Sequence, residues 1–225
     1  MAGALAIRLG EGLRRLYDDM DDGLPFSPSA AQAGRRALRL AVLALLTRRD
    51  GGKQASRAFA EARSMTEETG ALSALLEIGE GEAELAAFAS RWGGDRNVMD
   101  KWFALQIARA APDAAVPLTQ KLTAHPDFDW KTPNRFRAVI GALAANHAGF
   151  HHRSGAGYRL VADWLIRLDP LNPQTAARMS TAFETWPRYD AGRRKLVKRE
   201  LQRMLATPNL SGDLHEMAER LMAAG

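Results

Sequence analysis

The sequence predicts an all-α fold in which antiparallel helix pairs stack into a HEAT- or armadillo-like superhelical array. Apolar residues recur at spacings of three and four along almost the whole chain, which is the period of an amphipathic helix. No stretch shows the sustained alternation, rich in Val, Ile and Thr, that indicates a strand. Helical hairpins of this length usually bury their faces on one another. Because no long polar linker interrupts the pattern, residues 1–225 are expected to form a single helical-repeat domain.

The apolar spacing gives the extent of each expected helix in chain order. The predicted helices are 2–20, 28–48, 52–63, 66–78, 81–92, 96–110, 113–124, 133–146, 157–168, 173–186, 189–206 and 211–223. They amount to roughly six antiparallel pairs joined by short connections. No consensus repeats at a fixed period, so the repeat is expected in the structure only.

Helix starts and stops are marked by residues with known backbone preferences. Three dipeptides place a capping side chain before a proline, which suits the first helical position. They are Ser27-Pro28, Thr132-Pro133 and Asn172-Pro173. Glycines fall where helices should end, at 51–52, at 93–94 and in the RSGAG stretch 153–157.

Composition restricts the setting and the chemistry. The chain has no cysteine, which excludes disulfides, thiolate metal sites and a cysteine nucleophile, and a reducing cytoplasmic location is expected. The longest apolar run, 40–46, is far shorter than the ~20 residues that cross a bilayer. The first twenty residues do not have the pattern of a signal peptide. No membrane partner is therefore expected.

The net charge of +5 raises the question of nucleic-acid binding. The basic residues are dispersed along the chain, and the densest cluster is RYDAGRRKLVKRELQR at 188–203. Asp190 and Glu200 lie within this cluster, and at helical spacing it is typical of a solvated face. We expect no nucleic-acid partner.

His215-Glu216 begins like the zinc-binding motif H-E-x-x-H. In that motif the second histidine, at i+4, shares a helical face with the first. The i+4 position here is Glu219, so the motif is incomplete. His151 and His152 are adjacent in an expected loop, and this is a weak metal signal. No residue of this chain is predicted to be a metal ligand or a catalytic residue.

Two expected helices begin alike, with TPNRFR at 132–137 and NPQTAAR at 172–178. If they are parallel, their N-termini would lie on one rim, each with about half a positive charge from the helix dipole. Arg135 or Arg137 would add positive charge at the N-terminus of the first helix, and Arg178 would add it at the second. Such a rim would suit carbonyl or anionic groups of a peptide.

Gln174 and Arg178 are spaced i, i+4 and should share one helical face. We therefore name Gln174, Arg178 and Arg137 as candidate substrate-binding residues. The alternative for Arg178 is an ordinary ion pair within the domain, for example with Asp169.

Several longer stretches are more specific than an amphipathic pattern requires. In order they are SAAQAGRRALRLAVLALL, RSMTEETGALSALL, FASRWGGDRNVMDKWFALQ, HPDFDWKTPNRFRAVIGALAANH, FHHRSGAGYRLVADWLIRLDPLNPQTAARM, RYDAGRRKLVKRELQRM and NLSGDLHEMAERLMAAG. From about Ile7 to the end, the sequence resembles the C-terminal helical domain of bacterial aminopeptidase N, a zinc metallopeptidase of the gluzincin class.

The resemblance implies a non-catalytic domain that caps the active-site cavity and helps to control peptide access and binding. The zinc, its H-E-x-x-H helix and the G-A-M-E-N strand would belong to a catalytic domain of the same polypeptide, so this chain alone would be inactive and would carry no cofactor. The beginning of the helical domain would also be missing. The expected partners are that catalytic domain and peptide substrates, and the three candidate residues would face the cavity or its entrance.

The sequence departs from the family pattern at three positions. The family's turn F-H-x-x-D-G-S-G-Y has Ser154 for its acidic residue and Ala156 for its serine, and the first asparagine of N-P-N-R is Thr132. A different class of function stays open beside the aminopeptidase domain, namely a free-standing helical-repeat adaptor that binds protein or nucleic acid.

Overall fold

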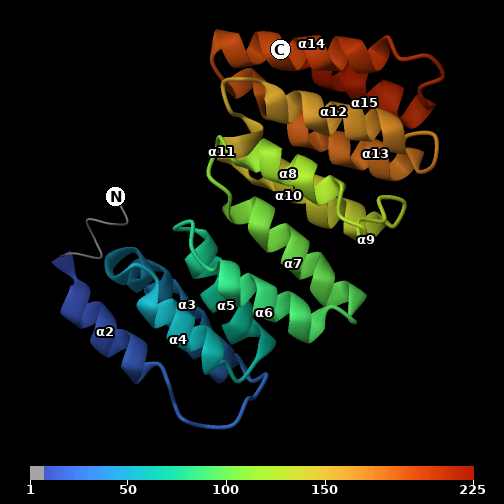
Figure 1. Ribbon diagram of the computed structural model, residues 1–225. Coiled ribbons are helices and arrows are strands. Elements are labelled where there is room, and N and C mark those ends of the chain that lie inside the picture. Colours follow the sequence, from blue (N-terminus) through green and yellow to red (C-terminus); the bar gives the residue numbers. More distant parts are fainter. Residues whose placement is uncertain (1–7) are drawn as a thin grey trace. The chain divides into compact units, whose positions relative to one another are not determined.

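The computed structural model describes residues 8–225 and contains helices and turns but no strand in that range (Figure 1). The all-α prediction is confirmed. Contacts between residues divide the chain into two compact units, Met1–Asp95 and Arg96–Gly225. The single domain over 1–225 stays a prediction, and each unit is described by itself.

The first unit is organised around its long second helix. Its elements are α2 (Gly10–Asp19), α3 (Ala30–Asp50), α4 (Lys53–Ala60), α5 (Met65–Leu76) and α6 (Glu82–Trp92). Helix α3 packs against α2, α4 and α5, and α4 packs against α5. Apolar residues at helical spacing in α3, Val42, Leu43 and Leu46, are buried with Phe59 and Leu72. Hydrophobic burial of these stripes holds the unit together.

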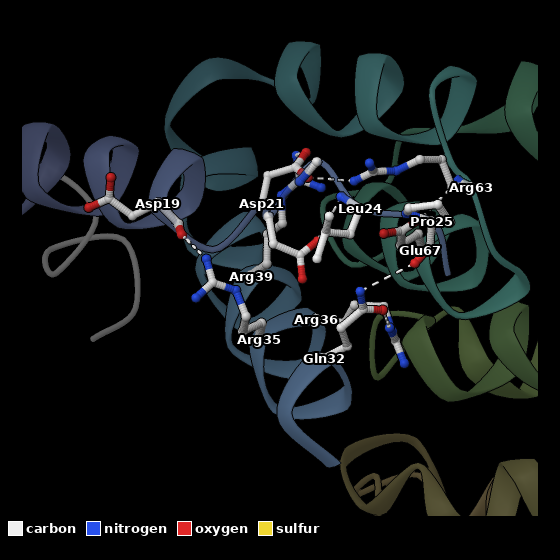
Figure 2. A network of polar contacts seen from close by, with 12 residues as sticks. Asp19, Asp21, Leu24, Pro25, Gln32, Arg35, Arg36, Arg39, Arg63 and Glu67 are labelled. Atoms are coloured by element: carbon white, nitrogen blue, oxygen red, sulfur yellow. Dashed lines mark hydrogen bonds and ion pairs between the residues drawn. The ribbon is translucent and has the colours of Figure 1, made fainter. Parts of the chain in front are cut away.

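The segment between α2 and α3 has no regular structure, and polar side chains hold it in place (Figure 2). Asp21 forms ion pairs with Arg63 at 2.6 Å and with Arg39 at 2.9 Å. The hydrogen bond from Arg63 is the main reason why the pKa of Asp21 lies below its usual value. Gln32 donates to the carbonyl of Pro25 at 3.2 Å. In this segment, side-chain contacts hold the backbone in position, because it lacks the regular backbone hydrogen bonds of a helix.

The second unit contains the remaining elements. They are α7 (Arg96–Arg109), α8 (Ala115–Thr123), α9 (Pro133–Phe136), η1 (Arg137–Gly141), α10 (Ala142–Ala145), α11 (His147–Phe150), α12 (Ala156–Leu168), α13 (Pro173–Ser180), η2 (Thr181–Phe183), η3 (Trp186–Arg188), α14 (Ala191–Leu205) and α15 (Gly212–Ala223). Helix α12 packs against α13 and α14, and α15 packs against the same two helices, as Figure 1 shows in orange and red. Buried aromatic and branched side chains from α7 to α15 fill the core of this unit.

Two of the three predicted caps require correction. Asn172 caps α13 by accepting a hydrogen bond from the backbone N–H three residues later, as predicted. Helix α3 is capped by Ser29 and not by Ser27, whose hydroxyl instead accepts from the Ser29 backbone N–H. Thr132 precedes α9, but its hydroxyl donates to Asp129 and makes no capping bond. In both cases the hydroxyl group forms a hydrogen bond within a neighbouring turn and not with the first backbone N–H groups of the helix.

The helix boundaries differ from the prediction mainly in the second unit. The expected helix 133–146 is divided by the π-helical turn η1, a local widening of the helix by one residue. The expected helix 173–186 ends at Ser180 and continues as short 3-10 turns. The short helix α11 lies where a loop was expected. Gly51 ends α3 with a left-handed φ of 67°, as predicted. Residues 2–7 of the first expected helix lie outside the described residues.

Candidate functional site

Two of the three candidate binding residues, Arg137 and Arg178, line the same open pocket. It is a shallow depression, wide open to solvent, with a volume of about 740 Å³. The other lining residues come from η1 and α10, from α13 and from η2. They are Gly141, Ala144, Thr175, Met179, Thr181 and Ala182.

Arg137 reaches this pocket because its neighbours in the chain are buried. It is the first residue of η1, and the next three residues, 138–140, pack into the core. The side chain of Arg137 is therefore directed to solvent, and its Nη1 donates to the Asn134 side-chain oxygen at 3.0 Å. One guanidinium nitrogen is held, and the others stay available for a ligand.

Arg178 is exposed in the last turn of α13, whose residues 175–177 are buried. Within residues 8–225 it makes no ion pair. Asp169, the alternative partner considered from the sequence, accepts hydrogen bonds from the backbone N–H and the hydroxyl of Ser211. The alternative of an ion pair between Arg178 and Asp169 is therefore wrong. The charge of Arg178 lies at the open pocket.

The structure does not bring Gln174 into this lining. Gln174 is exposed one turn before Arg178 on α13 and does not line the pocket. The N-terminus of α13 contributes only Thr175 to the lining, and the backbone N–H of Thr175 already donates to the capping side chain of Asn172. No residue of α9 lines the pocket. The positive character of the pocket comes from the two guanidinium groups.

Arg135, the other arginine considered for the first helix start, is not available to a ligand. It is 4% exposed and forms an ion pair with Asp100. It also donates to the backbone carbonyls of Asp127 and Arg96, and its guanidinium lies 4.8 Å from the centre of the Phe103 ring. Every feature of this environment is that of a structural ion pair.

The pocket residues that sequence reasoning missed follow helical spacing from the two arginines. Gly141 is four residues after Arg137, and Thr175 and Thr181 are three residues before and after Arg178. This spacing places residues on one face of a helix. Once the arginines were named, the same spacing could have found these three positions.

No group of three or more His, Asp or Glu side chains within residues 8–225 is placed to hold a metal ion. His215 Nδ1 lies 3.7 Å from a carboxylate oxygen of Glu219, as an i, i+4 pair on α15. Two such groups do not make the set of three or four ligands that zinc requires. The described residues therefore do not fit a zinc site.

His151 has a structural place in the core. It is 4% exposed, its Nδ1 lies within hydrogen-bond distance of the Tyr158 hydroxyl at 2.9 Å, and its ring stacks on Tyr189 with the ring centres 4.0 Å apart. Burial lowers the pKa of His151 to about 4, and the charges of His147 and Arg193 act in the same direction. The imidazole is therefore neutral in the folded protein at neutral pH.

This neutral histidine predicts a loss of stability in mild acid. Below the ordinary histidine pKa of about 6.5, the unfolded chain binds a proton that the folded chain does not bind until about pH 4. The contribution of His151 to the free energy of unfolding should be constant well above pH 6.5 and should fall between pH 6.5 and 4, by at most about 1.4 kcal/mol per pH unit. Urea unfolding at several pH values measures this slope. It should flatten in His151→Phe but not in His215→Gln; equal slopes in all three proteins would contradict the prediction.

The helices and the pocket together define the class of this protein: an all-α helical-repeat protein with an open pocket lined by two arginines. The chain belongs to the family described as "Domain of unknown function (DUF3458_C) ARM repeats", whose model matches residues 1–223, and is a C-terminal domain of an aminopeptidase N-like enzyme. The family description confirms the predicted repeat class.

Three similar proteins illustrate this membership. Aminopeptidase N of Caulobacter vibrioides is 39% identical over 97% of this chain and 26% of its own length, and aminopeptidase N of Escherichia coli is 35% identical over 75% of this chain and 20% of its own length. The crystal structure of Legionella pneumophila aminopeptidase A in complex with aspartic acid matches with a TM-score of 0.90 and 29% identity, over 100% of this chain and 28% of that one.

The chain spans about a quarter or less of the length of the curated relatives that it matches. It therefore corresponds to only a part of each of these relatives. Of the helices that the structure describes, none combines the length and apolar character needed to span a membrane.

Proposed function

We propose that this chain is the non-catalytic C-terminal domain of a zinc aminopeptidase, which removes N-terminal amino acids from peptides. In this proposal the domain caps the active-site cavity, limits access to it and binds the distal part of the peptide. The zinc belongs to the catalytic domain of the same polypeptide. The names of the relatives, all aminopeptidases, support the class of reaction.

One observation carries the binding role: Arg178 and Arg137 line one open pocket, and Arg178 has no ion pair within residues 8–225. An arginine that only stabilised the domain would be expected to meet a carboxylate, as Arg135 meets Asp100. A guanidinium in an open pocket can donate to the carbonyl oxygens or the C-terminal carboxylate of a peptide. Thr175 and Thr181 also line the pocket, and the Thr181 hydroxyl donates to the Arg178 carbonyl at 2.8 Å.

The test is Arg178→Ala in the full-length enzyme. A charge-assisted hydrogen bond contributes about 1.5–3 kcal/mol, so kcat/KM for peptides of several residues should fall about ten- to a hundredfold. Single-residue chromogenic amides are too short to reach this domain, and their kcat/KM should not change. Steady-state kinetics with a series of peptides of increasing length gives both numbers for each variant.

Controls separate substrate binding from a general loss of structure. Arg153→Ala, at an exposed arginine that does not line the pocket, should leave both classes of substrate unaffected. Gln174→Ala should have a smaller effect on peptides than Arg178→Ala, because Gln174 is exposed beside the pocket and does not line it. An equal loss on short and long substrates would assign Arg178 a structural role. Release of N-terminal amino acids by residues 1–225 alone would overturn the whole assignment.

A further inference from the structure

A second open groove lies along α14, apart from the arginine-lined pocket. Its volume is about 580 Å³, and we call it the basic groove. It is lined by four cationic side chains, Arg194, Lys195, Lys198 and Arg199, with Gln202 on the next turn. Its other side chains are mainly apolar and include Trp186, Ala191 and Leu196. Gly225 completes the lining, and none of the lining side chains is acidic.

The cations of the basic groove are largely unneutralised. Within residues 8–225, Arg194, Lys195 and Lys198 form no ion pair, and Lys198 Nζ lies over the face of Trp186, 5.1 Å from the ring centre. Arg199 pairs with Glu200 at 3.1 Å, but Glu200 is buried and also pairs with Arg203. A groove with this excess of positive charge favours an anionic occupant.

The apolar side chains of the groove are held in place by the core. The Trp186 indole N–H donates to the carbonyl of Leu221 at 2.9 Å, and only 1% of the residue is exposed. Its ring is therefore not free to stack on a nucleic-acid base, which requires an exposed aromatic face. The partly buried Leu196 gives the groove an apolar wall at one edge, beyond Arg199 and next to Gly155. A polyanion without apolar groups would leave this wall uncovered.

From these observations we propose that the basic groove binds a short acidic segment of a partner protein, in which carboxylate side chains alternate with apolar ones. The carboxylates contact Arg194, Lys195, Lys198 and Arg199, and an apolar side chain covers Leu196. From Arg194 to Gln202 the helix rises about 12 Å, a length that about four extended residues span. This proposal does not depend on the function proposed for Arg178.

The experiment uses the full-length protein and a fluorescein-labelled peptide of eight alternating Glu and Leu residues. Fluorescence anisotropy at 50 mM NaCl should show saturable binding, and the affinity should fall steeply by 300 mM NaCl because exposed charges are then screened. The double substitution Lys195→Glu and Lys198→Glu replaces two attractions by two repulsions and should weaken binding about tenfold or more. The salt titration of the unaltered protein does not depend on the folding of any variant.

The matched control carries the same change of charge outside the groove. Lys131→Glu with Arg153→Glu, both at exposed positions, should weaken binding less than twofold. Equal weakening by both double variants would show that net charge alone attracts the peptide and would overturn the proposal. Three other results would each overturn the proposal. The first is equal binding of a control peptide in which every Glu is replaced by Gln, and the second is tighter binding of an oligothymidylate of 20 nucleotides. The third is self-association of the protein that the double substitution in the groove abolishes. Absence of binding at 1 mM peptide would do the same.

Discussion

Replacing Arg135 by methionine should lower the free energy of unfolding by about 3–5 kcal/mol, the usual result of removing one partner of a buried ion pair. The Arg135 side chain is 5% exposed, and its partner Asp100 is 21% exposed. The substitution leaves the Asp100 carboxylate without its counter-ion. It also removes the donors that reach the carbonyls of Asp127 and Arg96. Methionine keeps the length of the side chain, so the loss reports mainly on charge and hydrogen bonding.

Chemical denaturation of the purified protein measures this loss. Arg137→Met is the matched control, because Arg137 is two residues away, exposed, and hydrogen-bonded only to Asn134. Its substitution should change the free energy of unfolding by less than about 0.5 kcal/mol. If Arg135→Met lowers the free energy of unfolding by less than about 1 kcal/mol, the prediction is contradicted. The attraction between Arg135 and Asp100 would then only offset the cost of removing both charges from water.

Asn146→Asp should cost about 3 kcal/mol at pH 7, although it changes a single heavy atom of the side chain, because each buried acceptor that loses its donor costs about 1–3 kcal/mol. The Asn146 amide nitrogen donates to the carbonyls of Ile107 and Ala110, each at 2.9 Å. Its oxygen accepts from the backbone N–H of Gly149 at 3.0 Å. The substitution keeps this acceptor but presents a second oxygen to the two carbonyls.

The pH dependence of this variant provides a second measurement. Burial and two facing carbonyls should raise the folded-state pKa of the carboxyl group introduced at position 146, since both disfavour the charged form. The difference from the unaltered protein should therefore shrink as the pH falls and the new carboxyl group regains a proton to donate. Asn134→Asp is the control: Asn134 is exposed, and its oxygen only accepts from Arg137. A similar loss at both positions would contradict the role of the Asn146 donors.

The sequence determined by itself the features that depend on neighbouring residues. Helical spacing predicted the all-α fold, Asn172 predicted the start of α13, and Gly51 predicted the end of α3. These predictions held because a helical stripe, a cap and a left-handed C-terminus are each decided within a few residues. The resemblance to the aminopeptidase N domain was likewise carried by continuous stretches of sequence.

Tertiary structure alone decided which charged residues face solvent. Arg135 and Arg137 differ little in the sequence, yet the packing of η1 and α7 pairs Arg135 with Asp100 and leaves Arg137 at the pocket. The sequence allowed Asp169 as an ion-pair partner for Arg178. In the structure its carboxylate accepts a hydrogen bond from Ser211, which is distant in the chain. Which partner a charged residue binds depends on contacts that form only when the helices pack together. An ion pair or an open pocket depends on distances between elements, and the spacing of residues along one helix does not contain those distances.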